Sequence, residues 1–437
     1  MAVIVDHLEV LYCEGWDPQA RAAASPLPPA LAAQRDRVGE QYAVLLSAPG
    51  RPLAIIEVAW RDAFCGVRFL DEQRRRVYAV DCRRLAPDRL FVIGGRQWRY
   101  ADPAQPEFDQ NTARREFEVS PDGRATGEIH GAPGEGSGGY TPDPPAAGSY
   151  WLDAPQFGGW GRFLAAFPDA LAALGHQVPA EVALEEVPVP SGDARSAGRQ
   201  LWHPPRPARP EHLDLLFTAG ARLVIDTSGS MFALGDTVAV EVRPAGTLRM
   251  PSGRLVVADP TWVEFPPPFI TTVPPGEYPV LLSLVRWADD PQHRRVAAAK
   301  LAIRDDPVAS WEMALLPGQD PRFLPDEAFY GFGVDSGNAC FLDAIATPAM
   351  ARQGEAFIVG GDIEITAELS DPESGANMIT FESGWGDGAY PTWIGRTSSG
   401  DLACFIADMV LLYGVVASFT RPTSPATDPG PGRPAAH

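Results

Sequence analysis

The sequence predicts a mainly β protein, a β-rich α+β fold with two domains of antiparallel sheet and a few short helices. Three observations lead to this prediction. The chain has 437 residues, which is long for one core and favours two domains. Its 42 glycines and 45 prolines exceed average usage and follow no collagen-like period, as expected of a loop-rich β protein. Short runs of β-branched and aromatic residues also alternate with turn sequences along most of the chain.

The first domain is expected at residues 1–186, as a β-meander with short helices. Turn sequences such as Ser120–Ala125 separate its strand-like runs, and sequential strands joined by tight turns normally pair antiparallel. The segment FGGWGRFLAAFPDALAALG has apolar residues at helical spacing, which predicts one or two short helices on the sheet. The run EQRRR around Arg75 is expected to be a solvated hairpin tip. The strand-like runs are YAVLLS, LAIIEVAW, CGVRFL, RRVYAV, RLFVIGG and REFEV.

The remaining chain divides into a linker, a second β domain and a tail. Residues 187–210 are rich in proline and small polar residues, the composition of an interdomain linker. Residues 211–418 again contain short alternating runs, which predict a second domain of antiparallel strands. Residues 419–437 are expected to be disordered, because such a composition cannot bury enough apolar surface to offset chain entropy.

The charge balance limits the classes of partner. The net charge of −20 repels phosphate backbones and anionic lipids, so neither nucleic acid nor a membrane is expected as a partner. A basic protein partner is compatible with it. Lys300 is the only lysine, a usage typical of GC-rich bacterial genomes.

Other sequence features favour a cytoplasmic protein. The five cysteines lack a C-x-x-C spacing, which argues against a zinc knot or a disulfide framework and favours free thiols. The start MAVIVDHLEV carries no basic leader, so no secretion signal is expected. The late apolar run Met409–Phe419 is shorter than the roughly 20 residues that a membrane helix needs.

Two short motifs match ligand-binding patterns without the required context. LVIDTSGSM has Asp226, Ser228 and Ser230 in the spacing that holds magnesium in a von Willebrand factor type A domain. The alternating FALGDTVAVEV that follows predicts a strand instead of the required helix, so Asp226 is expected in a turn. GEGSGG at Gly134–Gly139 formally fits G-x-G-x-x-G, but YTPDPP follows it and cannot open a helix, so a flexible loop is expected.

Several separated motifs in the second half carry a family resemblance. They are MPSGRLVVADP, PPGEYPVLLSLVRW, RVAAA, YGFGVDSGNACFLDA and SGWGDGAYP. From about Gly246 to Leu412 the chain resembles the bacterial domain of unknown function 4241 family. In that family an acidic residue commonly stands where this chain has Thr397, and loss of an activity is implied here if that acid is catalytic in relatives. The first domain resembles no family that we can name.

The motif blocks concentrate carboxylates and aromatic residues, which leaves several functions open. The scattered histidines and the lack of a G-x-S-x-G elbow give no coherent nucleophile and base. Clustered carboxylates can bind a divalent cation, so one hypothesis is a hydrolase or transferase with Asp335, Asp343 and Asp387 as catalytic candidates. Glycine-flanked acids also form turns, and the leading hypothesis is a binding or interaction protein, for example of the immunity type, with no cofactor. A scaffold domain of a larger assembly is the third. The candidate binding residues are Asp259, Glu382, Trp385, Tyr390, Trp393 and Asp408.

Overall fold

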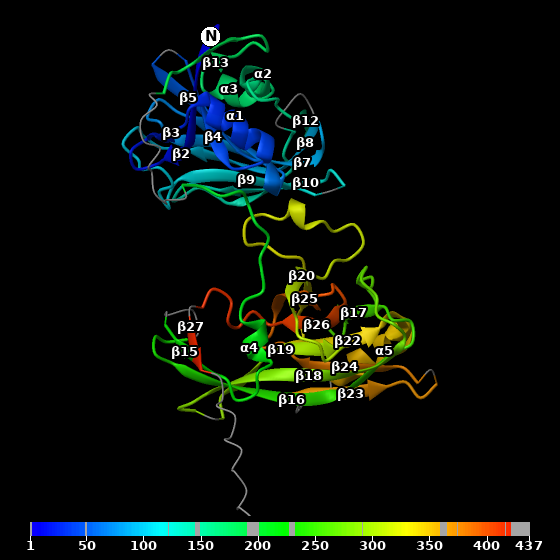
Figure 1. The fold of residues 1–437 in the computed structure, drawn as a ribbon. Coiled ribbons are helices and arrows are strands. Elements are labelled where there is room, and N and C mark those ends of the chain that lie inside the picture. The colour runs from blue at the N-terminus through cyan, green and yellow to red at the C-terminus, as the bar shows by residue number, and fades with distance from the viewer. Residues whose placement is uncertain are drawn as a thin grey trace, which may run out of the picture. The chain divides into compact units, whose positions relative to one another are not determined.

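The computed structural model divides the chain into two compact units (Figure 1). Unit 1 comprises Met1–Arg206 and Arg322–Asp326, and unit 2 comprises Pro207–Pro321 and Glu327–His437. Antiparallel strands dominate both units, which confirms the predicted mainly β class. The described residues are 2–48, 50–120, 122–144, 149–189, 201–226, 232–290, 292–358, 365–373, 375–415 and 417–420.

Unit 1 is a strand meander with short helices. Its helices are α1 (Pro29–Val38), η1 (Trp60–Asp62), α2 (Trp160–Leu164) and α3 (Pro168–Ala173). Its strands are β1 (Val3–Ile4), β2 (His7–Asp17), β3 (Ala22–Pro26), β4 (Tyr42–Ala48), β5 (Arg51–Ala59), β6 (Phe64–Leu70), β7 (Arg76–Ala86), β8 (Arg89–Arg99), β9 (Ala113–Val119), β10 (Ala125–His130), β11 (Gly138–Tyr140), β12 (Trp151–Asp153), β13 (His176–Gln177) and β14 (Ala183–Glu186).

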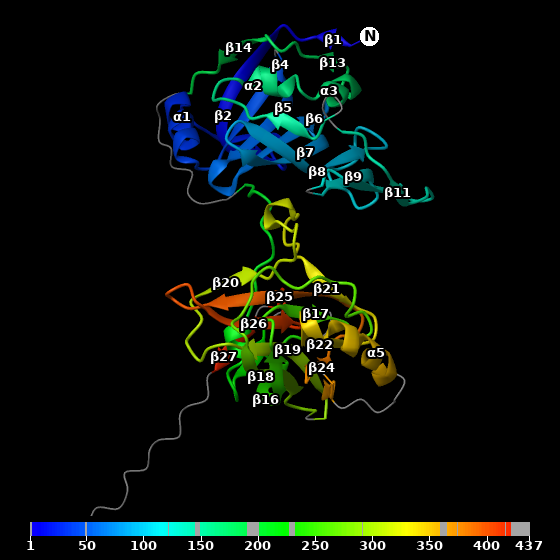
Figure 2. The ribbon, with the colours of Figure 1, turned by 90° about the vertical axis from the view of Figure 1, so that its right-hand side faces the viewer.

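The main sheet of unit 1 follows chain order. Among the described residues its order is β11-β10-β9-β8-β7-β6-β5-β4-β2-β14, with β12 on β8 and β3 on β2. Figure 2 shows α2 and α3 lying against this sheet. Trp160, Phe163 and Phe167 of this helical region are buried together with Tyr12 and Tyr42 of the strands. The amphipathic segment thus forms the predicted pair of short helices, and they cover one face of the sheet.

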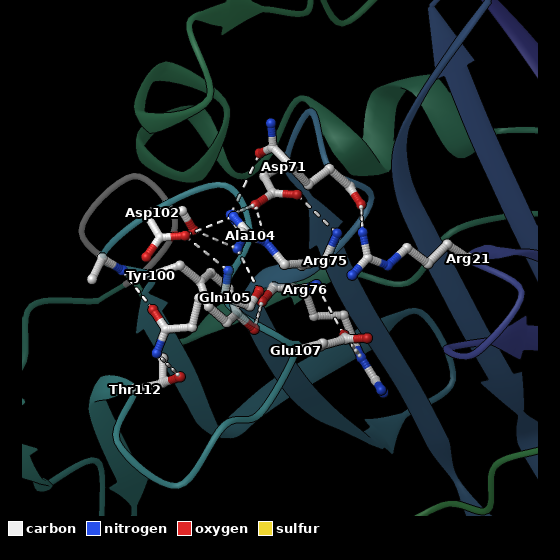
Figure 3. A network of polar contacts seen from close by, with 12 residues as sticks. Arg21, Asp71, Arg75, Arg76, Tyr100, Asp102, Ala104, Gln105, Glu107 and Thr112 are labelled. Atoms are coloured by element: carbon white, nitrogen blue, oxygen red, sulfur yellow. Dashed lines mark hydrogen bonds and ion pairs between the residues drawn. The ribbon is translucent and has the colours of Figure 1, made fainter.

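Arginine contacts fix the loop between β8 and β9. The Arg75 side chain donates to both a carboxylate oxygen of Asp71 at 2.8 Å and the carbonyl of Gln105 at 2.8 Å. Its guanidinium also lies 4.1 Å from the centre of the Tyr100 ring. Figure 3 shows these residues pointing toward one another. The expectation of a solvated tip was therefore wrong for Arg75, which is 4% exposed, because the 100–112 loop folds over it.

The described residues of unit 2 form two antiparallel sheets. Its helices are α4 (Leu213–Leu216), η3 (Ala344–Ala346) and α5 (Thr347–Ile358), and the 3-10 turn η2 (Pro321–Phe323) spans the boundary between the units. Its strands are β15 (Arg222–Ile225), β16 (Thr237–Met250), β17 (Leu255–Ala258), β18 (Gly276–Trp287), β19 (Arg294–Ala302), β20 (Ser310–Met313), β21 (Gly331–Val334), β22 (Asn338–Asp343), β23 (Thr366–Ser370), β24 (Asn377–Glu382), β25 (Gly388–Arg396), β26 (Leu402–Asp408) and β27 (Ala417–Thr420).

The two sheets of unit 2 are joined by a buried side-chain amide. In the described chain, the larger sheet has the order β20-β25-β26-β19-β18-β16-β15-β27, with β21 on β25, and the smaller one β17-β22-β24-β23. Asn377 of β24 donates to the carbonyl of Thr247 at 2.7 Å and accepts from the amide of Arg249 at 2.9 Å. Since both partners belong to β16, this amide links the smaller sheet to the larger one.

Three local expectations can be compared with the strands. β15, which precedes Asp226, pairs antiparallel with β16 and β27, so it does not belong to a parallel α/β layer. The remaining residues of that motif, 227–231, lie outside the described chain. Gly138 and Gly139 belong to β11, so the loop prediction was wrong there. β27 extends to Thr420, into the predicted tail, and residues 421–437 lie outside the described part.

Two further observations concern the whole described chain. All five cysteines are buried and free. None of the described helices has the length and apolar character needed to cross a membrane.

Candidate functional site

A pocket of about 350 Å³ lies in unit 2. Its walls come from the end of β17, the segments 259–269 and 314–319, the start of β21, and Thr392 of β25. These parts meet because β21 pairs with β25 and because β17 lies at the edge of the smaller sheet. The volume is in the range of small-molecule or side-chain binding sites.

Asp259 fixes the entrance loop of the pocket. One of its carboxylate oxygens accepts from the amide of Thr261 at 2.9 Å and from the Thr261 hydroxyl at 2.6 Å. The other accepts from the amides of Asp335 at 2.9 Å and Ser336 at 2.8 Å. Burial raises the pKa of Asp259, but these hydrogen bonds outweigh burial and hold the pKa below its ordinary value. Asp259 is therefore an ionised group that ties segment 259–261 to the turn after β21.

Aromatic side chains surround the pocket at two depths. Trp262 is 54% exposed and Phe265 is 71% exposed, and their rings meet at a 60° angle with centroids 5.9 Å apart. Deeper in the pocket, Phe269 is buried and stacks on Phe405 of β26 with centroids 6.1 Å apart. Two large neighbouring rings left in water are a feature of interaction sites. The outer pair is thus available to a ligand, whereas Phe269 belongs to the core.

Thr392 of β25 is one of the residues that line the pocket. The residue is 2% exposed, and its hydroxyl is buried without a hydrogen-bond partner among the described residues. Thr380 of β24 is buried to the same degree, yet its hydroxyl donates to the carbonyl of Ala367 at 3.2 Å. An unpaired buried hydroxyl costs about 1–3 kcal/mol, so it needs a structural or functional explanation. A ligand in the pocket would provide one.

Unit 1 has a cavity of similar size but opposite character. It measures about 340 Å³ and is lined by residues that include Arg68, Asp81 and Trp98. A terminal guanidinium nitrogen of Arg68 lies 3.0 Å from a carboxylate oxygen of Glu57 and 2.6 Å from one of Asp81. The pKa of Glu57 is raised, because the effect of burial exceeds the opposite effect of the positive charge on Arg68. Since these charges are paired with one another, a structural role explains them.

Comparison with known proteins identifies part of unit 2. Residues 248–407 match a family described as "Protein of unknown function (DUF4241)". These residues are a DUF4241 domain. The N-terminal half of the chain matches no family. Neither the curated proteins nor the solved structures compared with the chain gave a match.

The pocket lies within the DUF4241 domain, since its lining residues run from Val257 to Thr392. Of the residues selected from the sequence, the pocket contains Asp259. The others are distributed over turns and strands of unit 2.

Asp343 is a buried structural ligand of the backbone. Its carboxylate accepts from the amides of Ser252 at 2.9 Å, Gly253 at 3.0 Å and Ile345 at 2.9 Å, and from the Ser252 hydroxyl. These bonds join the P-S-G-R turn to the end of β22 and cap η3. The hydrogen bonds that Asp343 accepts from these turns are thus sufficient to explain this acid.

Asp335 and Asp387 lie on neighbouring turns away from Asp343. Both are exposed. Their turns touch, since the Ser383 amide donates to the Gly337 carbonyl at 3.1 Å. Asp335 precedes β22 and Asp343 ends it. Because each strand residue advances about 3.3 Å, the length of β22 separates the two carboxylates. The structure therefore brings two of the three catalytic candidates near each other, and the described residues contain no group of three or more His, Cys, Asp or Glu that could hold a metal ion.

Tyr390 and Trp393, the predicted binding residues on β25, are both buried. Trp393 donates from its indole nitrogen to a buried carboxylate oxygen of Asp408 at 3.2 Å. Burial raises the pKa of Asp408 to about 6. The Tyr390 hydroxyl donates to the carbonyl of Gly386 at 2.9 Å, which closes the glycine-rich turn. Trp385 is partly exposed in that turn, and Glu382 is half-buried at the end of β24.

Thr397 is a turn residue. Its hydroxyl accepts from the Asp401 amide at 3.2 Å and lies 2.8 Å from the Ser399 hydroxyl. These contacts close the hairpin between β25 and β26. The residue is therefore a local stabiliser, and the loss of a family activity through this position stays a prediction.

Sequence reasoning missed the residues that distinguish the pocket, namely Trp262, Phe265 and Thr392. A signal was present in the segment PTWVEFPPPF. It places three aromatic residues among prolines without strand or helix periodicity, so they cannot all be core positions of a regular element. Thr392 carried no comparable signal, because a threonine in a strand is ordinary.

Proposed function

We propose that this chain is a binding protein. Its ligand places an apolar group, or a group that packs against aromatic rings, in the pocket of the DUF4241 domain. The observation that carries the proposal is the exposed pair Trp262 and Phe265 at the edge of an apolar pocket. Exposed aromatic rings that rim a concave site are typical contact residues. The unpartnered hydroxyl of Thr392 supports it further, since a ligand could satisfy that atom.

The geometry supports binding better than metal-dependent catalysis. Asp343, one of the carboxylates proposed for a metal, is occupied by backbone amides, and the other two, Asp335 and Asp387, are not part of a group of three or more possible metal ligands among the described residues. A hydrolase or transferase would need a reacting group next to a site that can hold a substrate. In the pocket, the carboxylate of Asp259 already accepts four hydrogen bonds, which leaves it little capacity as a base.

A neutral fluorescent probe tests the pocket directly. N-phenyl-1-naphthylamine gains fluorescence in apolar surroundings, and we expect the full-length protein to bind it. Replacing both Trp262 and Phe265 by alanine should weaken binding about tenfold, the effect of removing anchor side chains. Gly333→Leu should abolish binding, because Gly333 lines the pocket in strand β21 and a Cβ placed there has open space around it.

Matched variants separate pocket binding from general surface binding. Phe419→Ala removes another exposed ring of unit 2, on β27, and Gly136→Leu adds a side chain in open space in unit 1. Both should bind the probe as the unmodified protein does. Equal binding by all four variants would show that the probe does not occupy the pocket and would refute the proposed function.

A further inference from the structure

The charges that line the pocket have one sign. Among the described residues, those that line the pocket include one carboxylate, Asp259, and no arginine, lysine or histidine. The depressed pKa of Asp259 keeps that carboxylate ionised at neutral pH. An anionic ligand would therefore find no countercharge in the wall. A cation would find a fixed negative charge in surroundings that exclude much of the water, where electrostatic attraction is stronger than in bulk solvent.

The aromatic rings favour the same sign of ligand. The face of a tryptophan, tyrosine or phenylalanine ring attracts cations. Trp262, Phe265, Tyr330 and Phe332 all line the pocket. The chain uses this contact elsewhere, for example where the Lys300 ammonium lies 5.5 Å from the centre of the Phe217 ring. Since no basic residue lines the pocket, its rings are open to a cation from outside.

The wall also offers a hydrogen-bond acceptor. The oxygen of the Thr392 hydroxyl is buried and lacks a partner among the described residues, and a hydroxyl has two acceptor lone pairs. Guanidinium and ammonium groups carry several N–H donors and no acceptor. Their apolar stems can also lie along Trp262 and Phe269 while the charged end reaches inward.

The identity of the partner follows from the surface around the pocket and from the charge of the chain. Trp262, Phe265 and Ile270 are all more than half exposed, so an occupant that covers them must extend beyond the pocket. The net charge of −20 favours association with a positively charged macromolecule and disfavours an acidic one.

We infer that the pocket of the DUF4241 domain receives the side chain of an arginine or lysine presented by a basic protein partner. This inference rests on the proposed function. Asp259 supplies the countercharge, the aromatic rings contact the cation and its stem, and Thr392 accepts a hydrogen bond. The exposed rings outside the pocket contact the partner's surrounding surface.

Competition against the bound fluorescent probe tests the sign of the charge. The competitor is the blocked pentapeptide acetyl-Gly-Gly-Arg-Gly-Gly-amide, and its control carries citrulline, which has the shape of arginine without the charge. We expect the arginine peptide to compete at about tenfold lower concentration than the citrulline peptide. Equal competition by the two peptides would overturn this inference, while probe binding itself would leave the proposed function standing.

Two variants test which residues cause the preference for the arginine peptide over the citrulline peptide. Thr392→Val keeps the shape of the side chain and should reduce the preference for arginine about threefold, through loss of the acceptor. Asp259→Asn should remove most of the preference, provided that its circular dichroism spectrum matches that of the unmodified protein. Thr392→Val keeps the test valid if Asp259→Asn fails to fold. An unchanged preference in Thr392→Val would refute the role of its hydroxyl.

A third competitor distinguishes the source of the cation. Agmatine carries the same guanidinium without a peptide backbone. We expect it to compete less well than the arginine peptide, because it does not cover Trp262 and Phe265. If agmatine competes as well as the peptide, the occupant is a free small amine and the protein-partner part of the inference is wrong.

Discussion

The cavities of unit 1 and unit 2 have nearly equal volumes, about 340 and 350 Å³, but opposite linings. In unit 1, Arg68, whose side chain is 13% exposed, forms ion pairs with Glu57 and Asp81. In unit 2, the wall contains exposed rings and the unpaired hydroxyl of Thr392. The charge of Arg68 at the first cavity is paired within the protein, whereas the second cavity has a polar side-chain atom and apolar surface without a partner among the described residues.

The difference teaches that cavity size alone does not identify a binding site. Strand register explains the cavity of unit 1, since Glu57, Gly66, Asp81 and Gly94 lie opposite one another across β5, β6, β7 and β8. Gly66 leaves room there for the Arg68 side chain, since a Cβ on Gly66 would lie 2.9 Å from a nitrogen of Arg68. A cavity formed in this way follows from the burial of an arginine.

Removing the charge of Arg68 should have the largest effect on stability of the changes that test the comparison between the two cavities. Arg68→Met leaves Glu57 buried without a countercharge, and we expect a loss of about 3–5 kcal/mol in the free energy of unfolding. Urea unfolding followed by circular dichroism measures it.

A rescue and a surface control complete that test. The double variant Glu57→Leu/Arg68→Met should recover part of the loss, because it removes the uncompensated charge. Arg99→Met breaks an exposed ion pair with Glu135 and should change stability by about 0.5 kcal/mol or less. If Arg68→Met proves as mild as Arg99→Met, the cavity of unit 1 has no structural ion cluster.

Asp408 allows a pH test of one of the buried carboxylates in unit 2. Its pKa rises from 3.8 to about 6 on folding, so the folded state binds the proton more tightly than the unfolded state. The resulting stability is present below about pH 4 and is lost as the pH rises through about 6. The loss is on the order of 3 kcal/mol. Asp408→Asn should therefore gain stability relative to the unmodified protein between about pH 4 and pH 7.

Thermal unfolding across that pH range, with Asp387→Asn as the exposed control, checks this prediction. The melting temperatures of the control should parallel those of the unmodified protein. Parallel curves for Asp408→Asn as well would mean that Asp408 titrates like an exposed carboxylate. The pKa of Asp259 shifts in the opposite direction, downward. Its two oxygens accept four hydrogen bonds, whereas Asp408 accepts from Val410 and Trp393.

The smallest expected effect on stability tests whether the Thr392 hydroxyl lacks a partner. Thr392→Val replaces an unpaired buried hydroxyl by a methyl group, and we expect a gain of about 1 kcal/mol in the free energy of unfolding. Thr380→Val is the matched control and should lose about 1 kcal/mol, because its hydroxyl donates to Ala367. Urea unfolding of both variants measures the contrast. A loss in Thr392→Val would show that its hydroxyl already has a partner.

The sequence predicted most strands of both units but missed several elements. The runs YAVLLS and CGVRFL form β4 and β6, because apolar β-branched residues between turns specify a strand locally. Helix α1 was missed, although Pro29 begins it and Gly39 follows it with a positive φ of 79°, the residues expected at these ends. Its apolar residues lack a clear helical stripe, so the periodicity signal was weak. Helix α5 was missed as well.

The residues of the candidate site were predicted less completely than the strands. Asp259 and the glycine-rich turns were selected from the sequence, and Asp259 lies in the pocket. The sequence could not separate it from Asp343, since both are acids beside turns, and their roles depend on which backbone amides face them. Trp262 and Phe265 were not selected, although their place among prolines outside a regular element was a readable signal.

The amino-acid sequence by itself determined the β class of this protein, its strand-rich halves and the family of residues 248–407. These properties depend on local alternation, turn residues and motif order, all of which can be read along the chain. Only the tertiary structure decided that segment 257–269, β21 and Thr392 meet around one pocket, and that the ionised Asp259 lies there with no basic neighbour in the wall. The physical reason is that strand pairing between distant segments sets these contacts, and a one-residue change of register would turn each side chain to the other face of its sheet.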